Sequence, residues 1–295
     1  MDSHSHSFRA DLFLLAATLL AAAGWVFSKE SLAGLAPLQF VGTRFLLAGV
    51  VLGGFSWRQL RMLSAEAVGR AAVVGVLFAA AMGLWIMGLQ HAHHLGEGAF
   101  IASLGIVLVP VFARIFFGEA PPLSTWLALP VALGGFACLS LAKGFQIEPG
   151  QWFFLGAALI FAFLFNLNSR VVRDVPVLAL STIQVLVVGA LILPLSFAFE
   201  TWPEVVPTSA IFWLLASAII ATTLRFLVQL HGQSLTTPSH AALILMLEPM
   251  WTALVAAWWF GERMSGLQLA GCALISLALV ISRWRWIRGV LKSVL

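Results

Sequence analysis

The chain alternates between long apolar runs and short polar connections. A helix that crosses a bilayer needs about 20 mostly apolar residues, and ten runs approach or exceed that length: 11–29, 36–56, 69–90, 96–117, 123–142, 151–169, 177–198, 209–231, 238–260 and 265–284. Backbone groups in lipid must bond within their own segment, so each run is predicted to be a helix. The connections leave no room for a soluble domain. We therefore expect an all-α integral membrane protein with ten transmembrane helices.

Composition and charge fit a membrane protein. Of the 295 residues, 61% are hydrophobic and 9% are charged, and the mean hydropathy is +1.01. Lys and Arg favour the cytoplasmic side. They gather at one set of run ends, with Arg9, Arg58, Arg61, Arg70, Arg114, Arg170, Arg173, Arg283, Arg285, Arg288 and Lys292 there against Lys29, Lys143 and Arg263 at the other. Both termini are thus expected in the cytoplasm, residues 1–10 as a disordered tail and 285–295 as a basic tail at the lipid headgroups. This charge needs no nucleic-acid partner.

The two halves of the chain repeat at an offset of 140 residues. The offset aligns Gly49 with Gly189 and His91 with His231, within a gapless register of apolar positions. Each half holds five runs, an odd number, so the second copy (148–284) should enter the membrane inverted relative to the first (11–147). Inverted repeats are a recurring plan of secondary transporters, with the substrate site near the midplane between the halves.

Two arginines inside the runs break the repeat. Arg44 aligns with Gln184, and Arg225 aligns with Trp85. A charge within a span is costly unless it faces a partner or a watery cavity. Either arginine could bind a carboxylate through its bidentate fork. Arg225 lies near enough to a run end that it could instead reach the interface.

Four amides are further candidates for lining a cavity: Asn166, Asn168, Gln184 and Gln229. Each could instead bond a neighbouring helix, which is a common role for amides in membranes. Because Asn166 and Asn168 are two residues apart, a straight helix cannot present both on one face. One of them is therefore expected to face away from the cavity.

Glu248 is the only acidic residue deep within a run, and Pro249 beside it disturbs the helix there. A buried carboxylate in a cavity is a candidate proton-coupling group. The alternative is a structural ion pair with Arg225 or a bond to a backbone donor. Trp25, Trp85 and Trp251 are the tryptophans least easily assigned to the membrane interfaces. They could form an aromatic wall for an apolar substrate or only pack helices together.

The segment 90–100, QHAHHLGEGAF, connects the third and fourth runs. Its histidines are spaced too irregularly to converge on zinc, so no metal site is expected. Glu97 falls in the first turn of the next helix, where a carboxylate is favoured, and Pro238 fits the first helical position at the matching place in the second half. We expect two pseudo-symmetric gate hairpins on opposite faces, with His91 and His231 holding them closed.

Several catalytic signatures are missing from the sequence. There is no Gly-rich phosphate loop ending in Lys-Ser or Lys-Thr, so ATP-driven transport by this chain is not expected. A His-Glu-x-x-His helix, a Gly-x-Ser-x-Gly turn and a Cys-x-x-Cys pair are also missing. We therefore predict no catalytic residues, no cofactor and no enzymatic activity.

Three short motifs carry a family resemblance: Thr43-Arg44-Phe45-Leu46-Leu47-Ala48, Pro110 followed by Gly118-Glu119, and Glu248-Pro249 followed by Gly261-Glu262-Arg263. With two halves of five runs, the chain resembles the EamA-type transporters of the drug/metabolite transporter superfamily, and most of all the bacterial exporters of aromatic and neutral amino acids of the YddG type. The resemblance implies a basket-shaped bundle in the bacterial inner membrane. Its central cavity would lie between the first four helices of each half, with the fifth and tenth helices packed together away from the pathway.

The resemblance also implies a function. It suggests alternating-access export of neutral, aromatic or hydrophobic amino acids without ATP, by a monomer or a homodimer. The substrate carboxylate would then meet Arg44 or helix-terminal N–H groups, and its side chain would meet Trp85, Phe100 or Trp251. The alternatives are a transporter for another solute, such as a cationic drug or a sugar derivative, a passive channel, and a membrane-embedded enzyme that acts on lipids. Such an enzyme would leave the inverted repeat unexplained.

Overall fold

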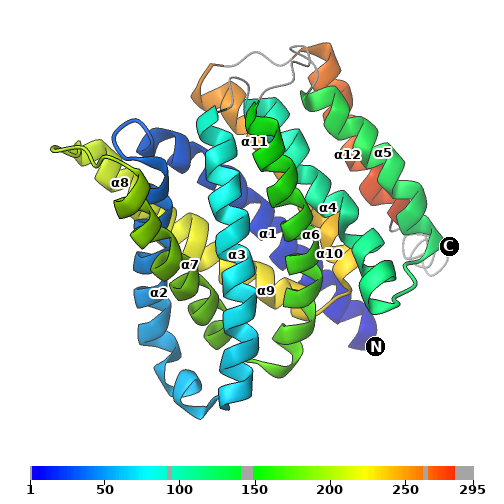
Figure 1. Cartoon of the computed structure of the whole chain (residues 1–295). Helices are drawn as coiled ribbons and strands as arrows, with labels where there is room; N and C mark the ends of the chain where they lie inside the picture. Colours follow the sequence, from blue (N-terminus) through cyan, green and yellow to red (C-terminus); the bar gives the residue numbers. More distant parts are fainter. Residues whose placement is uncertain (1, 92–94, 141–148, 262–264, 283–295) are drawn as a thin grey trace.

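The computed structural model describes residues 2–91, 95–140, 149–261 and 265–282, and every regular element in these ranges is a helix. The elements are α1 (Asp2–Ser31), α2 (Pro37–Met62), α3 (Ala65–His91), α4 (Leu95–Phe117), α5 (Leu123–Ser140), α6 (Pro149–Asp174), α7 (Val177–Phe199), α8 (Thr208–Ala216), the π-helix η2 (Ser217–Leu224), α9 (Arg225–Ser234), α10 (Pro238–Leu245), α11 (Glu248–Trp259) and α12 (Gly266–Ser282). Figure 1 shows them as a bundle in which α5 and α12 lie together at one side.

Seven helical stretches in the described ranges are long and apolar enough to cross a membrane: Phe8–Ser31, Pro37–Met62, Ala65–His91, Gly150–Asp174, Val177–Phe199, Thr208–Ser234 and Pro238–Trp259. Three shorter apolar helices accompany them: Ile101–Phe117, Leu123–Gly135 and Leu269–Ala278. The chain is thus a multi-pass membrane protein. By length and composition the structure supports seven of the ten predicted spans.

Three predicted elements need correction. Helix α1 begins at Asp2, so residues 2–10, expected to form part of a disordered N-terminal tail, belong to the first helix. The eighth run is not a plain α-helix, because the π-helix η2 lies between α8 and α9. The ninth run is two helices, α10 and α11, separated by Met246 and Leu247. Pro249 has no N–H and would clash with a preceding turn, so it sits at the start of α11 rather than inside one long helix.

The hydroxyls of Thr222 and Thr223 explain how η2 is supported. They donate to the carbonyl oxygens of Ser217 and Ala218, at 2.9 and 2.8 Å. Each carbonyl is five residues earlier, which is the spacing of a π-helix. Such wide turns are rare and occur often at functional sites.

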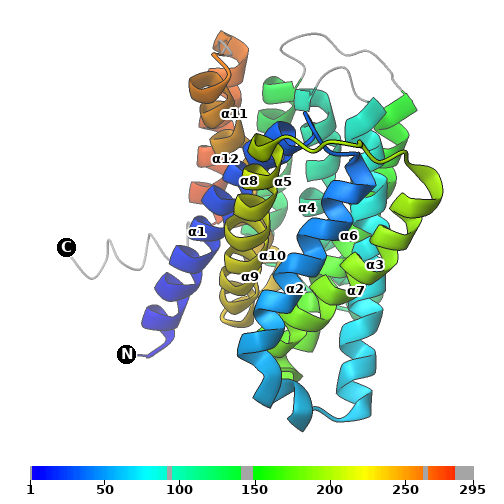
Figure 2. The same cartoon turned by 90° about the vertical axis from the view of Figure 1, so that its left-hand side faces the viewer.

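Helices α2 and α7 pack closely along their length, at the side of the bundle away from α5 and α12 (Figure 1 and Figure 2). Gly49 of α2 lies against Leu186 of α7, and Gly189 of α7 lies against Leu46 of α2. These are the same two positions of the repeat, exchanged between the halves. Small residues let membrane helices approach closely, so the glycine pair sets the distance between the two halves.

The outer helices also pack across the two halves. Helix α1 packs on α9, and its counterpart α6 packs on α3. The ring of Phe13 meets His231 edge-on, with centroids 4.7 Å apart, and Phe153 stacks on His91 at 5.7 Å. The first helix of each half is therefore held against the third predicted span of the other half. Helices α5 and α12 pack on each other, with Gly135 against the backbone of Gly271.

Candidate functional site

A cavity of about 200 Å³ lies between helices of both halves. Much of its wall is apolar and aromatic, formed by Phe45, Phe78, Met82, Trp85, Phe161 and Phe226. Its charged side chains, hydroxyls and amides come from α1, α2, α4, α6, η2, α9 and α11: Ser28, Arg44, Ser103, Asn168, Thr222, Arg225, Gln229 and Glu248. An apolar pocket with a few polar groups is the usual form of a small-molecule site.

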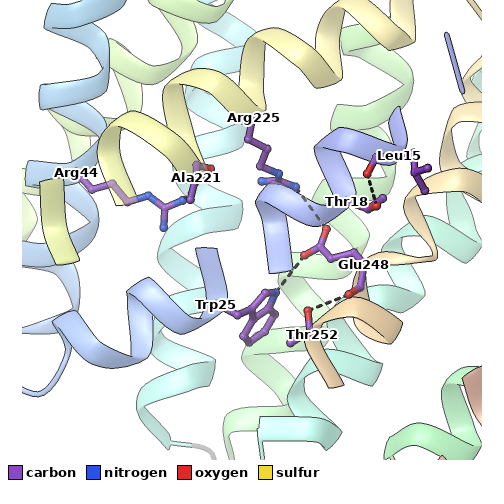
Figure 3. A network of polar contacts seen from close by, with 8 residues as sticks. All are labelled: Leu15, Thr18, Trp25, Arg44, Ala221, Arg225, Glu248 and Thr252. Atoms are coloured by element: carbon purple, nitrogen blue, oxygen red, sulfur yellow. Dashed lines mark hydrogen bonds and ion pairs between the residues drawn. The ribbon is translucent and has the colours of Figure 1, made fainter. Parts of the chain in front are cut away.

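Arg44 is buried, with 7% of its surface exposed, and its guanidinium is held by neutral groups. Its Nε donates to the hydroxyl of Thr222, its Nη1 to Ser28 Oγ at 3.3 Å and its Nη2 to the carbonyl of Ala221 at 3.4 Å. Figure 3 shows the side chain beside Ala221. Within the described part of the chain, no carboxylate lies within ion-pair distance of Arg44.

Hydrogen bonds within their own helices orient the hydroxyl acceptors of Arg44. Ser28 Oγ donates its own hydrogen to the carbonyl of Gly24 at 2.6 Å, and Thr222 donates to Ser217 in η2. Each hydroxyl oxygen is then left to accept from the guanidinium. Three of the five guanidinium N–H groups are used in this way, which leaves one on each terminal nitrogen. Two remaining donors on one guanidinium can bind a carboxylate.

Glu248 lies at the first position of α11, where it joins three helices. Its Oε1 accepts from Trp25 Nε1 of α1 at 3.1 Å, and its Oε2 is 3.6 Å from Arg225 Nη2 of α9. Figure 3 shows the carboxylate between these two partners. Trp25 also meets Trp85 edge-on, with ring centroids 5.0 Å apart. One carboxylate therefore links α1, α9 and α11 at the edge of the cavity.

The second half has a neutral counterpart of the Arg44 site. Gln184 Nε2 donates to Asn168 Oδ1 at 2.6 Å, and these residues align with Arg44 and Ser28 across the repeat. Asn168 lines the cavity, but Gln184 lies behind it and is fully buried. The halves thus share a side-chain contact between their first two helices, and the charge is on the first half alone.

Two of the remaining expected cavity residues lie elsewhere. Asn166 is fully buried and donates to the carbonyls of Val109 and Ala162, at 2.9 and 3.0 Å, so it joins α6 to α4. Trp251 is outside the cavity lining and packs on the apolar cluster around α5, α10 and α12. In both cases the rotation of the helix turns the side chain away. Phe100 lies in α4, but its side chain is outside the described residues.

The expected gate residues lie at helix ends. His91 ends α3, and its Nδ1 is 2.8 Å from the carbonyl of Met87. His231 lies near the end of α9, and Pro238 is the buried first residue of α10. Glu97 is in the first turn of α4, and its side chain is outside the described residues. Among the residues that are described, no three His, Cys, Asp or Glu side chains gather to hold a metal.

One residue of the site was not singled out from the sequence, namely Thr222 as a partner of Arg44. A weak signal for Thr222 exists, because Thr222 and Thr223 form the polar pair within an apolar run, one turn before Arg225. Trp25 was expected as a candidate for the aromatic wall, and it does line the cavity, but its bond to Glu248 was not predicted. Its N–H meets Glu248 only because α1 packs on α11.

Comparisons with known proteins agree with this architecture. The model of the EamA-like transporter family matches the chain twice, over residues 8–141 and 148–284. Two proteins of Archaeoglobus fulgidus, each described as an uncharacterized transporter, are 27% identical over 92% of this chain and 85% of the relative, and 25% identical over 63% and 67%. A protein of known crystal structure superposes with a TM-score of 0.80 at 20% identity, over 95% of this chain and 98% of its own, which shows the fold alone. The two family matches cover most of the chain, which therefore belongs to the EamA-like transporter family.

Proposed function

We propose that this transporter is a secondary, alternating-access exporter of neutral, aromatic or hydrophobic amino acids in a bacterial inner membrane. In this proposal α4, α5 and α12 also cross the bilayer, so that ten spans form two inverted repeats of five. Both termini then lie in the cytoplasm, as the Lys and Arg at the run ends indicate. The exchanged contacts of Gly49 and Gly189, and of His91 and His231, support an arrangement of two equivalent halves.

The observation that carries the substrate class is Arg44. It is a buried cation with donors left over, and no carboxylate of the described chain pairs with it. A buried charge is costly without a partner, and a substrate carboxylate on the two free N–H groups would supply one. The neighbouring rings of Phe45 and Phe78 then suit an apolar side chain.

The cavity itself narrows the choice between solutes. Its volume of about 200 Å³ is below the range of roughly 300–1,000 Å³ common for drug-sized ligands. An unpaired Arg44 would also repel a cationic drug. A small solute with one carboxylate and an apolar body fits both properties better, and neutral amino acids with large side chains are the metabolites of this kind that we propose.

The test is counterflow of labelled amino acids in proteoliposomes, with Arg44→Lys, Arg44→Gln and Arg61→Gln beside the unchanged protein. Lysine keeps the charge but loses the bidentate fork, so we expect apparent affinity to fall about 10- to 100-fold, as for loss of a hydrogen bond to a charged group. Arg61 lies on the same helix over the Trp57 ring, outside the cavity, and serves as the matched control. Flux equal to that of empty liposomes for every amino acid would refute the substrate class.

A further inference from the structure

The contact between Arg225 and Glu248 is an ion pair without a hydrogen bond. The closest atoms, Arg225 Nη2 and Glu248 Oε2, are 3.6 Å apart, whereas a charge-assisted hydrogen bond is typically about 2.7–2.9 Å long. The Nε of Arg225 is buried and has no partner in the described chain. Both side chains keep some exposure, 26% for Arg225 and 21% for Glu248, and both line the cavity. The pair is therefore loose and reachable by a bound solute.

The charges of the lining provide separate partners for the carboxylate and the ammonium group of an amino acid. The described lining carries two cations, Arg44 and Arg225, and one anion, Glu248. If the substrate carboxylate binds Arg44, as in the proposed function on which this inference rests, its ammonium group still needs an acceptor. Glu248 is the one carboxylate that the described lining offers.

We infer that the substrate ammonium takes the place of Arg225 on Glu248, so that this ion pair is a clasp that the substrate opens. An ammonium is a compact group with three donors, and it can approach Glu248 to full hydrogen-bond distance. Glu248 keeps its bond to Trp25 meanwhile, because that bond uses the other carboxylate oxygen. The substrate ammonium thus binds Glu248 in competition with Arg225.

Opening this clasp has a consequence for the helices. Arg225 is the first residue of α9, directly after the π-helix η2, and Glu248 begins α11 directly after the break at Met246 and Leu247. The ion pair therefore joins the junction of η2 and α9 to the break before α11, two places where the helical hydrogen bonding is irregular. A ligand moves an equilibrium only by its differential affinity for the two states. Replacement of Arg225 by a substrate ammonium supplies such a difference.

The experiment compares ligands with and without the amino group. Binding of phenylalanine and of phenylpropionate, and of leucine and isocaproate, is measured by titration calorimetry on the purified full chain. The ratio of the two dissociation constants within each pair gives the amine preference. We expect Glu248→Gln to lower this preference at least 10-fold and Arg225→Gln to raise it at least 3-fold. Glu66→Gln, an exposed carboxylate at the start of α3, is the control and should leave it unchanged.

The outcomes separate this inference from the proposed function. If phenylalanine and leucine are transported but Glu248→Gln weakens the amino acid and its deaminated analogue equally, Glu248 has a structural role and the clasp is refuted. A fall of the amine preference in Arg225→Gln refutes it as well, because Arg225 would then assist the amino group. If Glu248→Gln does not fold, Arg225→Gln alone decides. Failure of the unchanged protein to bind or transport any amino acid refutes the proposed function itself.

Discussion

At the crossing of α2 and α7, alanine substitutions at the two equivalent glycines, Gly49 and Gly189, should differ in their effect on stability. A Cβ added at Gly189 would lie 2.7 Å from the backbone nitrogen of Leu46 as well as 2.6 Å from its Cγ. A Cβ added at Gly49 would meet chiefly the side chain of Leu186, with Cγ at 2.7 Å and the backbone Cα at 3.3 Å. A side chain can change rotamer, but a helix backbone can move only together with its helix.

The cost of each substitution follows from these contacts. Overpacking of a close interior costs about 1–3 kcal/mol, and alanine recovers roughly 0.8–1 kcal/mol over glycine inside a helix. For Gly189→Ala the clash with the backbone should dominate, with a net loss of about 1–2 kcal/mol. For Gly49→Ala the cost of overpacking and the gain in helix propensity should nearly cancel. At about 2–4 °C per kcal/mol for a large domain, Gly189→Ala should unfold roughly 2–8 °C below Gly49→Ala.

Thermal unfolding in detergent, followed by size-exclusion chromatography with fluorescence detection, measures this difference. Gly54→Ala is the matched control on α2, because nothing lies within 4 Å of its added Cβ. The control should unfold at or above the temperature of the unchanged protein. The packing argument is refuted if Gly49→Ala loses as much stability as Gly189→Ala, or if the control loses as much as either.

Two further predictions concern η2 and the gate hairpins. Thr222→Val leaves the Nε of Arg44 without its acceptor and should cost about 1–3 kcal/mol, whereas Thr223→Val removes the same kind of bond within η2 without touching Arg44 and should cost less; their unfolding temperatures give the comparison. His91→Ala and His231→Ala should change the maximal rate of counterflow more than the apparent affinity, because both rings contact the opposite half at helix ends and not the cavity. A changed order of preference among amino acids in either variant would contradict this.

The sequence repeat predicted much of the packing. Gly49 with Gly189, and His91 with His231, were the aligned pairs that composition alone does not explain, and each pair occupies equivalent contacts in the two halves. A sequence repeat predicts packing in this way because residues that make the same contact in each half must satisfy the same requirements of size and shape. The family match to both halves rests on the same property.

The faces of the helices could not be predicted. The sequence does not show which of Asn166 and Asn168 faces the cavity. In the structure α6 packs on α4, so that Asn166 bonds the carbonyl of Val109 and Asn168 lines the cavity. Hydropathy also shows no irregular turn inside an apolar run, so η2 was missed. Pro249 predicted a disturbance in the ninth run, but not that two separate helices would result. Such details depend on tertiary contacts that lie far apart in the sequence.

The cavity lies where the repeat is broken. Arg44 aligns with Gln184, and Trp85 with Arg225, yet three of these four residues line the cavity. In the proposed mechanism the packing contacts must be equivalent in both halves, because each half takes the same role in turn on opposite faces. The solute has no such symmetry, since its carboxylate and its side chain need different partners. A symmetric frame with an asymmetric lining meets both requirements, and it explains why the charged groups lie at unmatched positions while the glycines and histidines lie at matched ones.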